Sequence, residues 1–467
     1  MENMEIEKLV HACGGTYHGD KQALEECIAG VVLDSRKVEK GYCFVATRGE
    51  RVDGHNFISD VFAKGAKLVV CEYIPGQTTG NFILVKDSFQ ALRDMAEYYR
   101  STLSIPIVGI TGSVGKTSTK EFIAGVLAQK YHVLKTEGNF NNEIGVPLTL
   151  LRIRKEHEIA VVEMGINHFG EMRRLSKMVR PDVCVMTNIG ECHLEFLESR
   201  VGVLRAKSEI FEYMQDGGTV FVNGDDDMLQ TIGEVKGRKP ERFGIDPAND
   251  YYASDIVSKG LMGSEALISM KNENGERETF KAQIHLPGEH MVRNALAATA
   301  VAKYFHLTTE EIAAGIAGVM PVGGRSNLIQ CGKMMVIDDC YNANPVSMKA
   351  AIDLLCTADG DRVAILGDMG ELGEKEELFH KEIGAYAVSK KITGLICIGR
   401  LARFMFENAG SVKEETGSVT ELGHYETLDA FLESVPGQSF LKKECTVLVK
   451  ASHSMCFSKI VDVLKQA

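Results

Sequence analysis

The sequence predicts an α/β protein of about three domains. Its 467 residues suit three units at roughly 150 residues each. After residue 106, short apolar runs typical of buried strands alternate with helix-like stretches, which indicates mostly parallel sheets with helices on both faces. A glycine-rich loop lies between one such strand and the helix that follows it, and loops of this kind bind phosphate groups.

The three expected domains differ in size and pattern. We expect a small α/β domain at residues 1–105, a central domain on a mostly parallel, P-loop-type sheet at residues 106–320, and a Rossmann-like, doubly wound domain at residues 321–467. In the first domain the strands are expected at Tyr42–Ala46 and Lys67–Cys71, and a helix at Ser88–Arg100.

The central domain begins with the most regular alternation of the chain. Phe122, Ile123, Val126 and Leu127 recur at helical spacing, which predicts a helix over Lys116–Lys130. A hairpin with a glycine-containing turn at 272–276 is expected near the end of this domain. The expected strands are Ile107–Thr111, Ile159–Met164, Val183–Thr187 and Thr219–Asn223, followed by the hairpin strands Ala266–Met270 and Thr279–His285.

The C-terminal domain repeats the alternation of strand and helix. In doubly wound folds, ligands bind at the carboxyl ends of the strands, so polar residues that follow these strands are candidate site residues. The expected strands are Met334–Asp338, Arg362–Leu366, Gly394–Ile398 and Thr446–Val449.

Composition and charge exclude several classes of protein. Apolar residues make up 45% and charged residues 25% of the chain, which excludes a collagenous or disordered protein. The net charge of −12 argues against wrapping of nucleic acid. The 12 cysteines show no CxxC spacing, so we expect free thiols. We find no apolar leader and no run of about 20 apolar residues, and we expect a cytoplasmic protein with no integral membrane contact.

The glycine-rich loop spans Gly109 to Thr117. Its glycines would let backbone N–H groups surround phosphate oxygens, and the helix N-terminus adds partial positive charge. We expect Lys116 to face solvent and reach the β- and γ-phosphates, and the Thr117 hydroxyl to bind Mg²⁺. The strict pattern would place glycine at position 110, where this chain has Ile110. The alternative is a glycine turn that arose by chance.

Two further residues are candidate metal ligands. Glu163 ends an apolar strand, where an acid would face a bound nucleotide, and His193 follows the next strand within reach of the same edge. The alternatives are a solvated strand-end acid and an ordinary core or surface histidine.

Other polar residues are less specific. From the residues alone, Lys207 is a surface lysine, which would pair with Glu209 or Glu212, and the acidic run at 225–227 is best interpreted as a solvated turn. Asn344 and Pro345 suit a helix start. That interpretation leaves unexplained why Asp338, Asp339, Tyr341 and Asn342 crowd into the bend before it.

Taken together, these motifs resemble the Mur ligase family, which builds the peptide stem of bacterial cell-wall precursors. The family loop Thr-Gly-x-x-Gly-Lys-Thr is matched by Thr111 to Thr117. The segments from Glu137 to Pro147, from Tyr341 to Pro345 (YNANP) and from Ala364 to Glu371 (AILGDMGE) are similar to the member that adds D-alanyl-D-alanine to UDP-N-acetylmuramoyl-tripeptide. The resemblance implies that ATP and Mg²⁺ are used, that an acyl phosphate forms, and that the enzyme is a monomer acting on small molecules.

The resemblance also implies roles for individual residues. Lys116, His193 and Lys207 would be catalytic, with Lys207 carbamylated as in many Mur ligases, and Thr117, Glu163 and His193 would hold metal. The ATP-binding residues would be Thr111, Gly112, Ser113, Val114, Gly115, Lys116, Thr117, Ser118, Asn294, Arg325, Asp338, Asp339 and Tyr341. The uridine nucleotide substrate would be bound by Asp34, Ser35, Arg36, Asp53, Gly54, His55, Asn139, Asn141 and Asn142, and the acceptor dipeptide by Asn342, Asn344 and His453.

One segment departs from the family pattern. The family's last strand usually ends Lys-Gly-Ser-Arg with an acid a few residues on, whereas this chain has Lys450-Ala451-Ser452-His453 and then Ser458. The departure leaves open whether the acceptor ends in alanine, serine or lactate, and the third stem residue is also open. The rival functions are a tripeptide-forming Mur ligase, which should contain Asp-Tyr-Ala-His near position 339, a folylpolyglutamate synthase, and a non-catalytic NTP sensor.

Overall fold

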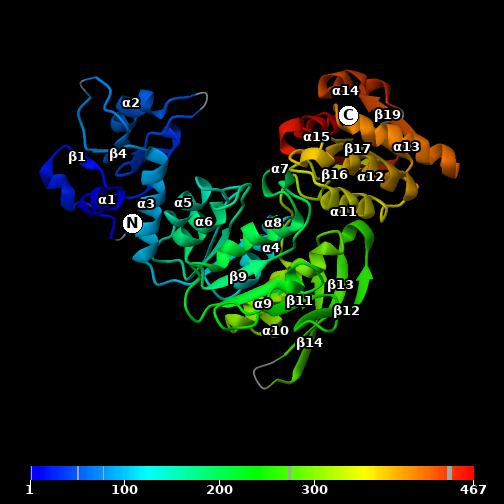
Figure 1. Cartoon of the computed structure of the whole chain (residues 1–467), viewed down its shortest axis with the longest axis horizontal. Coiled ribbons are helices and arrows are strands. Elements are labelled where there is room, and N and C mark those ends of the chain that lie inside the picture. The colour runs from blue at the N-terminus through cyan, green and yellow to red at the C-terminus, as the bar shows by residue number, and fades with distance from the viewer. Residues whose placement is uncertain (2, 50–51, 77, 272–274, 439–443, 467) are drawn as a thin grey trace.

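The computed structural model describes residues 1, 3–49, 52–76, 78–271, 275–438 and 444–466, and the strands of this part form three sheets. Figure 1 shows them in three successive units, with the N-terminal unit in blue and the C-terminal unit in yellow to red on either side of the central one. None of the helices in the described ranges is long and apolar enough to cross a membrane.

The N-terminal unit carries a small sheet in the order β1-β5-β4-β3-β2, parallel except at the β1–β5 pair. The two strands and the helix expected here are present, with ends shifted by no more than one residue. The strands are β1 Thr16–His18, β2 Val31–Val32, β3 Cys43–Val45, β4 Leu68–Cys71 and β5 Phe82–Leu84, and the helices are α1 Ile6–Cys13, α2 Ile58–Ala63 and α3 Ser88–Ser101.

The central unit holds the long sheet β14-β13-β12-β11-β10-β9-β6-β8-β7. It is parallel from β7 to β12 and is extended by the antiparallel hairpin β13–β14, so the predicted mostly parallel sheet is confirmed. Residues 272–274 of the expected turn lie outside the described residues. The strands are β6 Ile107–Thr111, β7 Val133–Lys135, β8 Ile159–Glu163, β9 Val183–Met186, β10 Thr219–Asn223, β11 Glu241–Gly244, β12 Tyr251–Ser258, β13 Ser264–Lys271 and β14 Arg277–Ile284.

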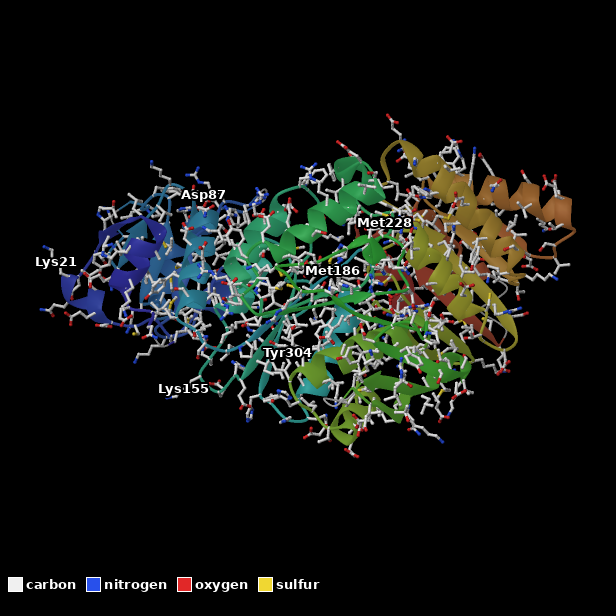
Figure 2. All side chains as sticks on the ribbon, turned by 60° about the horizontal axis from the view of Figure 1, so that its bottom comes forward. Lys21, Asp87, Lys155, Met186, Met228 and Tyr304 are labelled. Atoms are coloured by element: carbon white, nitrogen blue, oxygen red, sulfur yellow. The ribbon has the colours of Figure 1, made fainter. Side chains whose placement is uncertain are left out.

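Helices cover both faces of the central sheet because successive strand residues point to opposite sides. Val161 and Val185 pack with helices α4, α9 and α10, whereas Val162 and Met186 pack with α3, α5, α6 and α8. Figure 2 shows Met186 in the middle of the molecule and Lys155 at its margin. The helices are α4 Lys116–Leu127, α5 Gly145–Leu150, α6 Glu171–Val179, α7 Leu194–Leu197, α8 Arg200–Ser208, α9 His290–Tyr304 and α10 Thr309–Ala317.

Helix α3 joins the first two units. Its buried Tyr99 donates a hydrogen bond to the carbonyl of Ile153 at 2.7 Å, and Arg100 Nε donates to the carbonyl of Val179 at 2.8 Å. One continuous apolar cluster therefore runs from the N-terminal sheet into the central unit. This packing places the N-terminal end of α3 near the carboxyl ends of the central strands.

The C-terminal unit has the sheet β15-β16-β20-β17-β18-β19, parallel except at β15. Helices α11, α12 and α13 pack on one face and α14 and α15 on the other, which confirms the doubly wound architecture. The domain boundaries after residues 105 and 320 stay a prediction. The elements are β15 Asn327–Cys331, β16 Met334–Asp338, β17 Asp361–Gly367, β18 Gly394–Ile398, β19 Glu421–Tyr425 and β20 Cys445–Lys450, with α11 Pro345–Leu355, α12 Glu376–Ser389, α13 Ala402–Thr416, α14 Leu428–Ser434 and α15 Ser458–Leu464.

Candidate active site

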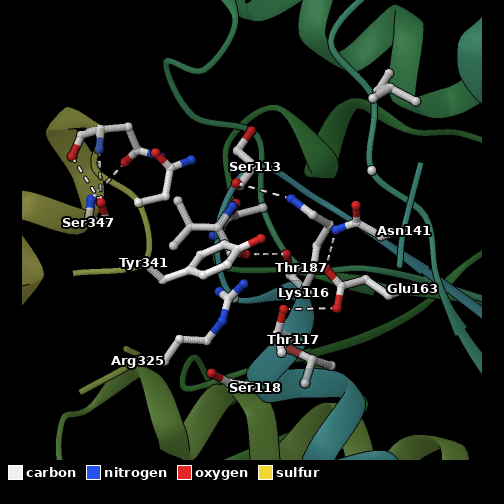
Figure 3. Close-up of a pocket in the computed structure, with 18 of the residues that line it drawn as sticks. Ser113, Lys116, Thr117, Ser118, Asn141, Glu163, Thr187, Arg325, Tyr341 and Ser347 are labelled. Carbon is white, nitrogen blue, oxygen red and sulfur yellow. Dashed lines mark hydrogen bonds between the residues drawn. The ribbon is translucent and has the colours of Figure 1, made fainter. Parts of the chain in front are cut away.

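A cavity of about 800 Å³ lies where the carboxyl ends of the central strands face the C-terminal unit. The loops after β6, β8 and β9 line one side of it, and the residues around Arg325 and Tyr341 line the other (Figure 3). Asp87, Phe89 and Arg93 at the start of α3 also reach it. All three units therefore contribute to one cavity, as expected for a site at strand ends.

The predicted phosphate loop connects β6 to α4. Gly112 has φ +152°, and a Cβ there would overlap the Thr187 hydroxyl, so this position requires glycine. The loop is held from β9, because Asn188 accepts the N–H of Ser113 at 3.0 Å and that of Val114 at 2.8 Å. The N–H groups of the first turn of α4 have no partner within the helix and are the natural donors to a phosphate.

Lys116 is half-buried rather than solvent-facing. Its Nζ donates to the carbonyl of Gly112 at 2.8 Å and to that of Ser113 at 3.4 Å. Burial lowers the pKa of Lys116, and the charge of Glu163 opposes that shift. The expectation of a solvent-facing lysine was wrong because the side chain folds onto its own loop. A bound phosphate would replace these carbonyls as its partner.

Glu163 is fully buried at the end of β8, so the alternative of a solvated strand-end acid is wrong. Its Oε2 accepts the Thr117 hydroxyl at 2.8 Å and its Oε1 accepts the Asn141 amide at 2.7 Å, as Figure 3 shows. The Nζ of the buried Lys120 lies 4.0 Å from Oε2, and the Thr136 hydroxyl accepts the Glu163 N–H at 3.0 Å. The carboxylate is thus fixed beside the phosphate loop.

The oxygen atoms of Thr117 and Glu163 fit a hard cation such as Mg²⁺. In the ranges that the structure describes, no group of three or more His, Cys, Asp or Glu side chains is arranged to hold a metal ion by itself. A magnesium ion here would therefore be completed by phosphate oxygens and water, which is the usual case for Mg²⁺ at a nucleotide.

His193 follows β9 and lines the same cavity. Its Nδ1 lies 2.5 Å from Oε2 of Glu371, in the loop after β17 of the C-terminal unit. Burial lowers the pKa of His193, and the hydrogen bond from His193 lowers the pKa of Glu371. Both shifts favour a neutral imidazole beside an ionised carboxylate.

Lys207 on α8 is completely buried, so the surface-lysine alternative is wrong. Glu209 instead accepts the backbone N–H of Arg173, and Glu212 pairs with the Arg173 guanidinium. Among the described residues, Lys207 Nζ is a buried polar atom without a hydrogen-bond partner. Burial lowers the pKa of Lys207 to about 8, and the charge of Lys116 acts in the same direction.

The bend after β16 is braced from β20. Asp339 accepts the Ser326 N–H at 2.9 Å and the ammonium of the buried Lys450 at 2.6 Å. Asp338 is buried, does not line the cavity, and accepts the Gly324 N–H at 3.0 Å. These bonds explain why two acids stand in one bend.

The bracing positions the two side chains that face the phosphate loop. The Arg325 guanidinium lies 4.0 Å from the centre of the Tyr341 ring, over its face, and Figure 3 shows the pair opposite Lys116 and Glu163. Asn342 and Asn344 also line the cavity. Asn344 caps α11 by accepting the Ser347 N–H at 2.9 Å.

Asn294 on α9 lines the cavity and is nearly buried. Its side-chain oxygen accepts the hydroxyl of Thr119 at 3.0 Å. Sequence reasoning missed Thr119, together with the supporting residues Lys120 and Thr136. Thr119 and Lys120 could have been found from the sequence, because they lie on the first turns of α4, the helix that follows the phosphate loop directly.

Several residues expected to bind the uridine nucleotide lie in the N-terminal unit, away from this cavity. Asp34 caps the 3₁₀ helix Ser35–Lys37 and pairs with Arg36, and Asp53 caps the 3₁₀ helix Gly54–Phe57. His55 is 1% exposed, and both ring nitrogens are engaged, by Asp53 and by the Glu72 N–H. A contact of these residues with a substrate stays a prediction.

The remaining predicted residues divide into two groups. Asn141 and Asn142 line the cavity, whereas Asn139 does not. His453 is exposed outside the cavity lining, at the start of the 3₁₀ helix His453–Met455, and its ring meets the Tyr341 ring edge-on at 5.7 Å. The roles of Asn139, Asn142 and His453 stay predictions.

The acidic run at 225–227 is only partly the solvated turn that was expected. Asp225 accepts the Ile245 N–H at 2.7 Å and the Arg293 guanidinium at 3.1 Å, and Asp226 accepts the Ile189 N–H at 2.9 Å. Asp227 alone is well exposed, with 72% of its side chain accessible. The first two acids therefore hold the loops after β11 and β9.

Comparison with protein families matches three segments of the chain. Residues 27–100 match the Mur ligase family, catalytic domain, residues 110–302 the Mur ligase middle domain, and residues 324–453 the Mur ligase, glutamate ligase domain. The matched segments follow the three units of the structure.

Individual relatives match over nearly the whole length. The UDP-N-acetylmuramoyl-tripeptide–D-alanyl-D-alanine ligase of Bacillus subtilis is 38% identical over 93% of this chain and 92% of its own. A crystal structure of MurF from Acinetobacter baumannii superposes with a TM-score of 0.87 at 31% identity, covering 99% of both chains. The MurF ligase of Thermotoga maritima in complex with ADP gives a TM-score of 0.79 at 28% identity, covering 94% of this chain and 97% of its own. The chain belongs to the Mur ligase family.

Proposed function

We propose that the chain is the ATP-dependent ligase that adds D-alanyl-D-alanine to UDP-N-acetylmuramoyl-tripeptide, releasing ADP and phosphate and supplying the pentapeptide precursor of peptidoglycan. The observation that carries the proposal is the phosphate loop beside the buried Glu163, in a cavity between the central and C-terminal units. The choice of substrates rests on relatives that bear this enzyme's name and align with over 93% and 96% of the chain.

A carboxylate must be activated before an amine can attack it. A carboxylate is a poor electrophile, so its oxygen first attacks the γ-phosphorus of ATP, and ADP leaves. The acyl phosphate that results is then attacked by the free amine of the dipeptide, and phosphate leaves with the former carboxylate oxygen. The protein contributes positioning and charge stabilisation.

Lys116 and Arg325 supply positive charge from opposite sides of the cavity. Lys116 is held by two carbonyls in its own loop, and Arg325 by the ring of Tyr341, so each is placed before ATP arrives. Because the cavity lies between units, closure of the units would exclude water from the acyl phosphate.

Thr117 and Glu163, with His193, would hold Mg²⁺. When bound, the ion would neutralise charge on the ATP phosphates. The hydrogen bond from Asn141 to Glu163 orients the carboxylate for that role.

Lys207 is proposed to be carbamylated. Its neutral amine would attack CO₂, forming an N–C bond and releasing one proton, which yields an anionic carbamate. The lowered pKa of about 8 makes the neutral amine roughly 300-fold more abundant at pH 7 than at the ordinary 10.5. A carbamate would also give the unpartnered Nζ a bonding role and place a negative charge near Lys116.

The remaining predicted residues belong to the substrate subsites. Asn342, Asn344 and His453 would receive the dipeptide next to Arg325. The uridine nucleotide would be bound by Asp34, Ser35, Arg36, Asp53, Gly54, His55, Asn139, Asn141 and Asn142. We also propose a monomer acting in the cytoplasm, with the oligomeric state testable by sedimentation.

The function is tested by ADP release from the purified enzyme with ATP, Mg²⁺ and UDP-N-acetylmuramoyl-tripeptide. Release that requires D-alanyl-D-alanine, with product five residues long by mass spectrometry, supports the proposal. Release driven by a single diamino acid with a dipeptide-linked substrate would indicate the tripeptide-forming ligase, and release driven by glutamate with a folate would indicate folylpolyglutamate synthase. ATP binding without any acceptor-dependent turnover would indicate a sensor.

The carbamate is tested with Lys207→Ala. We expect this variant to be nearly inactive and to be partly rescued by acetate, which supplies a small carboxylate. Enzyme equilibrated with ¹³C-bicarbonate should show a carbamate carbon resonance that Lys207→Ala lacks. A fully active Lys207→Ala enzyme would overturn the assignment.

A further inference from the structure

His193 and Glu371 meet across two units of the fold. They stand 178 positions apart, and Nδ1 of His193 lies 2.5 Å from Oε2 of Glu371. Helix α7, which starts directly after His193, lies against the C-terminal unit in Figure 1 and contacts the 3₁₀ helix Gly373–Lys375. Leu194 packs against the apolar core that helices α11, α12 and α13 form with the C-terminal sheet. Glu371 ends the AILGDMGE segment, to which the proposed function gives no role.

The backbone on both sides of this contact is unusual. His193 has φ +52° and Glu371 has φ +60°, the left-handed region that residues other than glycine adopt rarely. Such conformations persist only where surrounding structure holds them, and they gather at functional sites. Here the Glu195 N–H lies 3.5 Å from the Glu371 carbonyl, and a Cβ on Gly373 would lie 3.4 Å from the Glu195 Cα. Two strained turns therefore bring these two side chains together.

The contact determines which ring nitrogen of His193 is free. A carboxylate is only an acceptor, so the neutral ring must donate its Nδ1–H to Glu371. The other ring nitrogen, Nε2, then carries a lone pair. No other described residue forms a hydrogen bond with Nε2. His193 lines the cavity together with Thr117 and Glu163. Histidines that bind metal are commonly oriented in this way by a carboxylate on the other nitrogen.

We propose that Glu371 is a positioning residue for His193: it fixes the ring and its tautomer so that Nε2 serves a cation at the nucleotide. Because Glu371 belongs to the C-terminal unit, the histidine is set for metal only while that unit is docked on the central one. This inference rests on the proposed function for the presence of a metal–nucleotide complex, and it adds a coupling between unit docking and metal affinity.

The test measures metal binding rather than turnover. Enzyme saturated with a non-hydrolysable ATP analogue is titrated with Mn²⁺, and free Mn²⁺ is followed by electron paramagnetic resonance. We expect Glu371→Ala to weaken Mn²⁺ binding by roughly tenfold or more, and Glu371→Gln, which keeps an acceptor oxygen, to weaken it less. The matched control is Glu374→Gln, an exposed acid on the same loop, which should bind Mn²⁺ as the parent does.

Two further measurements separate positioning from a merely structural role. In a His193→Ala background, Glu371→Ala should add no further loss of Mn²⁺ affinity. In metal-free enzyme labelled with ¹⁵N-histidine, His193 should show a protonated Nδ1 and a bare Nε2, a pattern that Glu371→Ala loses. The ¹⁵N spectrum of the His193 ring needs neither metal nor substrate. It therefore tests the contact with Glu371 even if the parent enzyme proves not to be a ligase.

Parent-like Mn²⁺ affinity in Glu371→Ala would overturn the inference. So would an equal loss in the His193→Ala background, or an unchanged His193 spectrum. The Mn²⁺ titrations and the ¹⁵N spectra can give the expected results while the parent enzyme releases no ADP with the dipeptide. In that case the proposed function is wrong and the positioning role of Glu371 remains.

Discussion

Replacing Lys207 by methionine should make the enzyme more stable at neutral pH while removing its activity. Methionine keeps most of the unbranched stem and carries no charge. Lys207 is fully buried on α8, and its Nζ has no hydrogen-bond partner in the described part of the chain, so in the unmodified enzyme a proton on that amine is costly.

The magnitude follows from the pKa of Lys207. Burial lowers it from the ordinary 10.5 to about 8, which corresponds to about 3 kcal/mol of lost stability when the amine is protonated. The unfolded chain binds the extra proton between these two values, so the stability of the parent enzyme rises with pH across that window. Below pH 8 the penalty is fully present, and above pH 10.5 it has vanished.

The measurement is urea unfolding followed by circular dichroism in CO₂-free buffer, at pH 7 and again near pH 10. Lys207→Met should exceed the parent by a few kcal/mol at pH 7 and by much less near pH 10. The matched control is Lys459→Met, an exposed lysine on helix α15, which should change stability little at either pH. An equal difference at both pH values, or a less stable Lys207→Met at pH 7, would show that the buried ammonium of Lys207 does not destabilise the fold.

Three other substitutions test the phosphate loop, the buried Lys450–Asp339 pair and the cap of α11. Lys116→Ala should abolish turnover, because a desolvated charge contact to phosphate contributes several kcal/mol to the transition state; single-turnover assays measure this, and parent-like rates would refute the phosphate-loop role. Lys450→Met should destabilise the C-terminal unit by about 3–5 kcal/mol in urea unfolding, because it leaves the carboxylate of Asp339 without its buried partner; an unchanged midpoint would contradict this. Asn344→Ala should cost about 1 kcal/mol in the same experiment through loss of the α11 cap, and no cost would show that the cap contributes nothing.

The sequence was most informative where a strand is buried on both faces. Ile107–Thr111, Thr219–Asn223 and Gly394–Ile398 were predicted with the bounds that the structure shows. Each is an apolar run that ends at a glycine or polar residue, and such runs identify buried parallel strands. The phosphate loop was identifiable for a related reason, because its glycines and its flanking elements are local in sequence.

The errors share one physical origin, which is that burial is a tertiary property. Arg205-Ala206-Lys207-Ser208-Glu209 has the composition of an exposed helix, yet Lys207 is fully buried on α8, which packs against α6 and α7. The Lys116 ammonium was expected in solvent, but it donates hydrogen bonds to carbonyls of its own loop. Asp225 looked solvated, and it proved to accept N–H groups from a loop twenty residues later.

Contacts between segments far apart in the chain could not be predicted from the sequence. The pairing of His193 with Glu371 depends on how the C-terminal unit docks, and neither residue's neighbours encode it. The same holds for Lys450 and Asp339, which are 111 positions apart and meet only because β20 lies next to β16. Family resemblance supplied residue roles that spacing alone did not.

We propose that the tripeptide carboxylate is activated by phosphorylation in the cavity between Lys116 and Arg325. This step is tested most directly by supplying UDP-N-acetylmuramoyl-tripeptide with both oxygens of the reacting carboxylate labelled with ¹⁸O, together with ATP and D-alanyl-D-alanine. We expect one ¹⁸O atom in each phosphate released, because the carboxylate oxygen that attacked phosphorus leaves with it. Phosphate that carries no ¹⁸O while the pentapeptide forms would contradict the acyl-phosphate route.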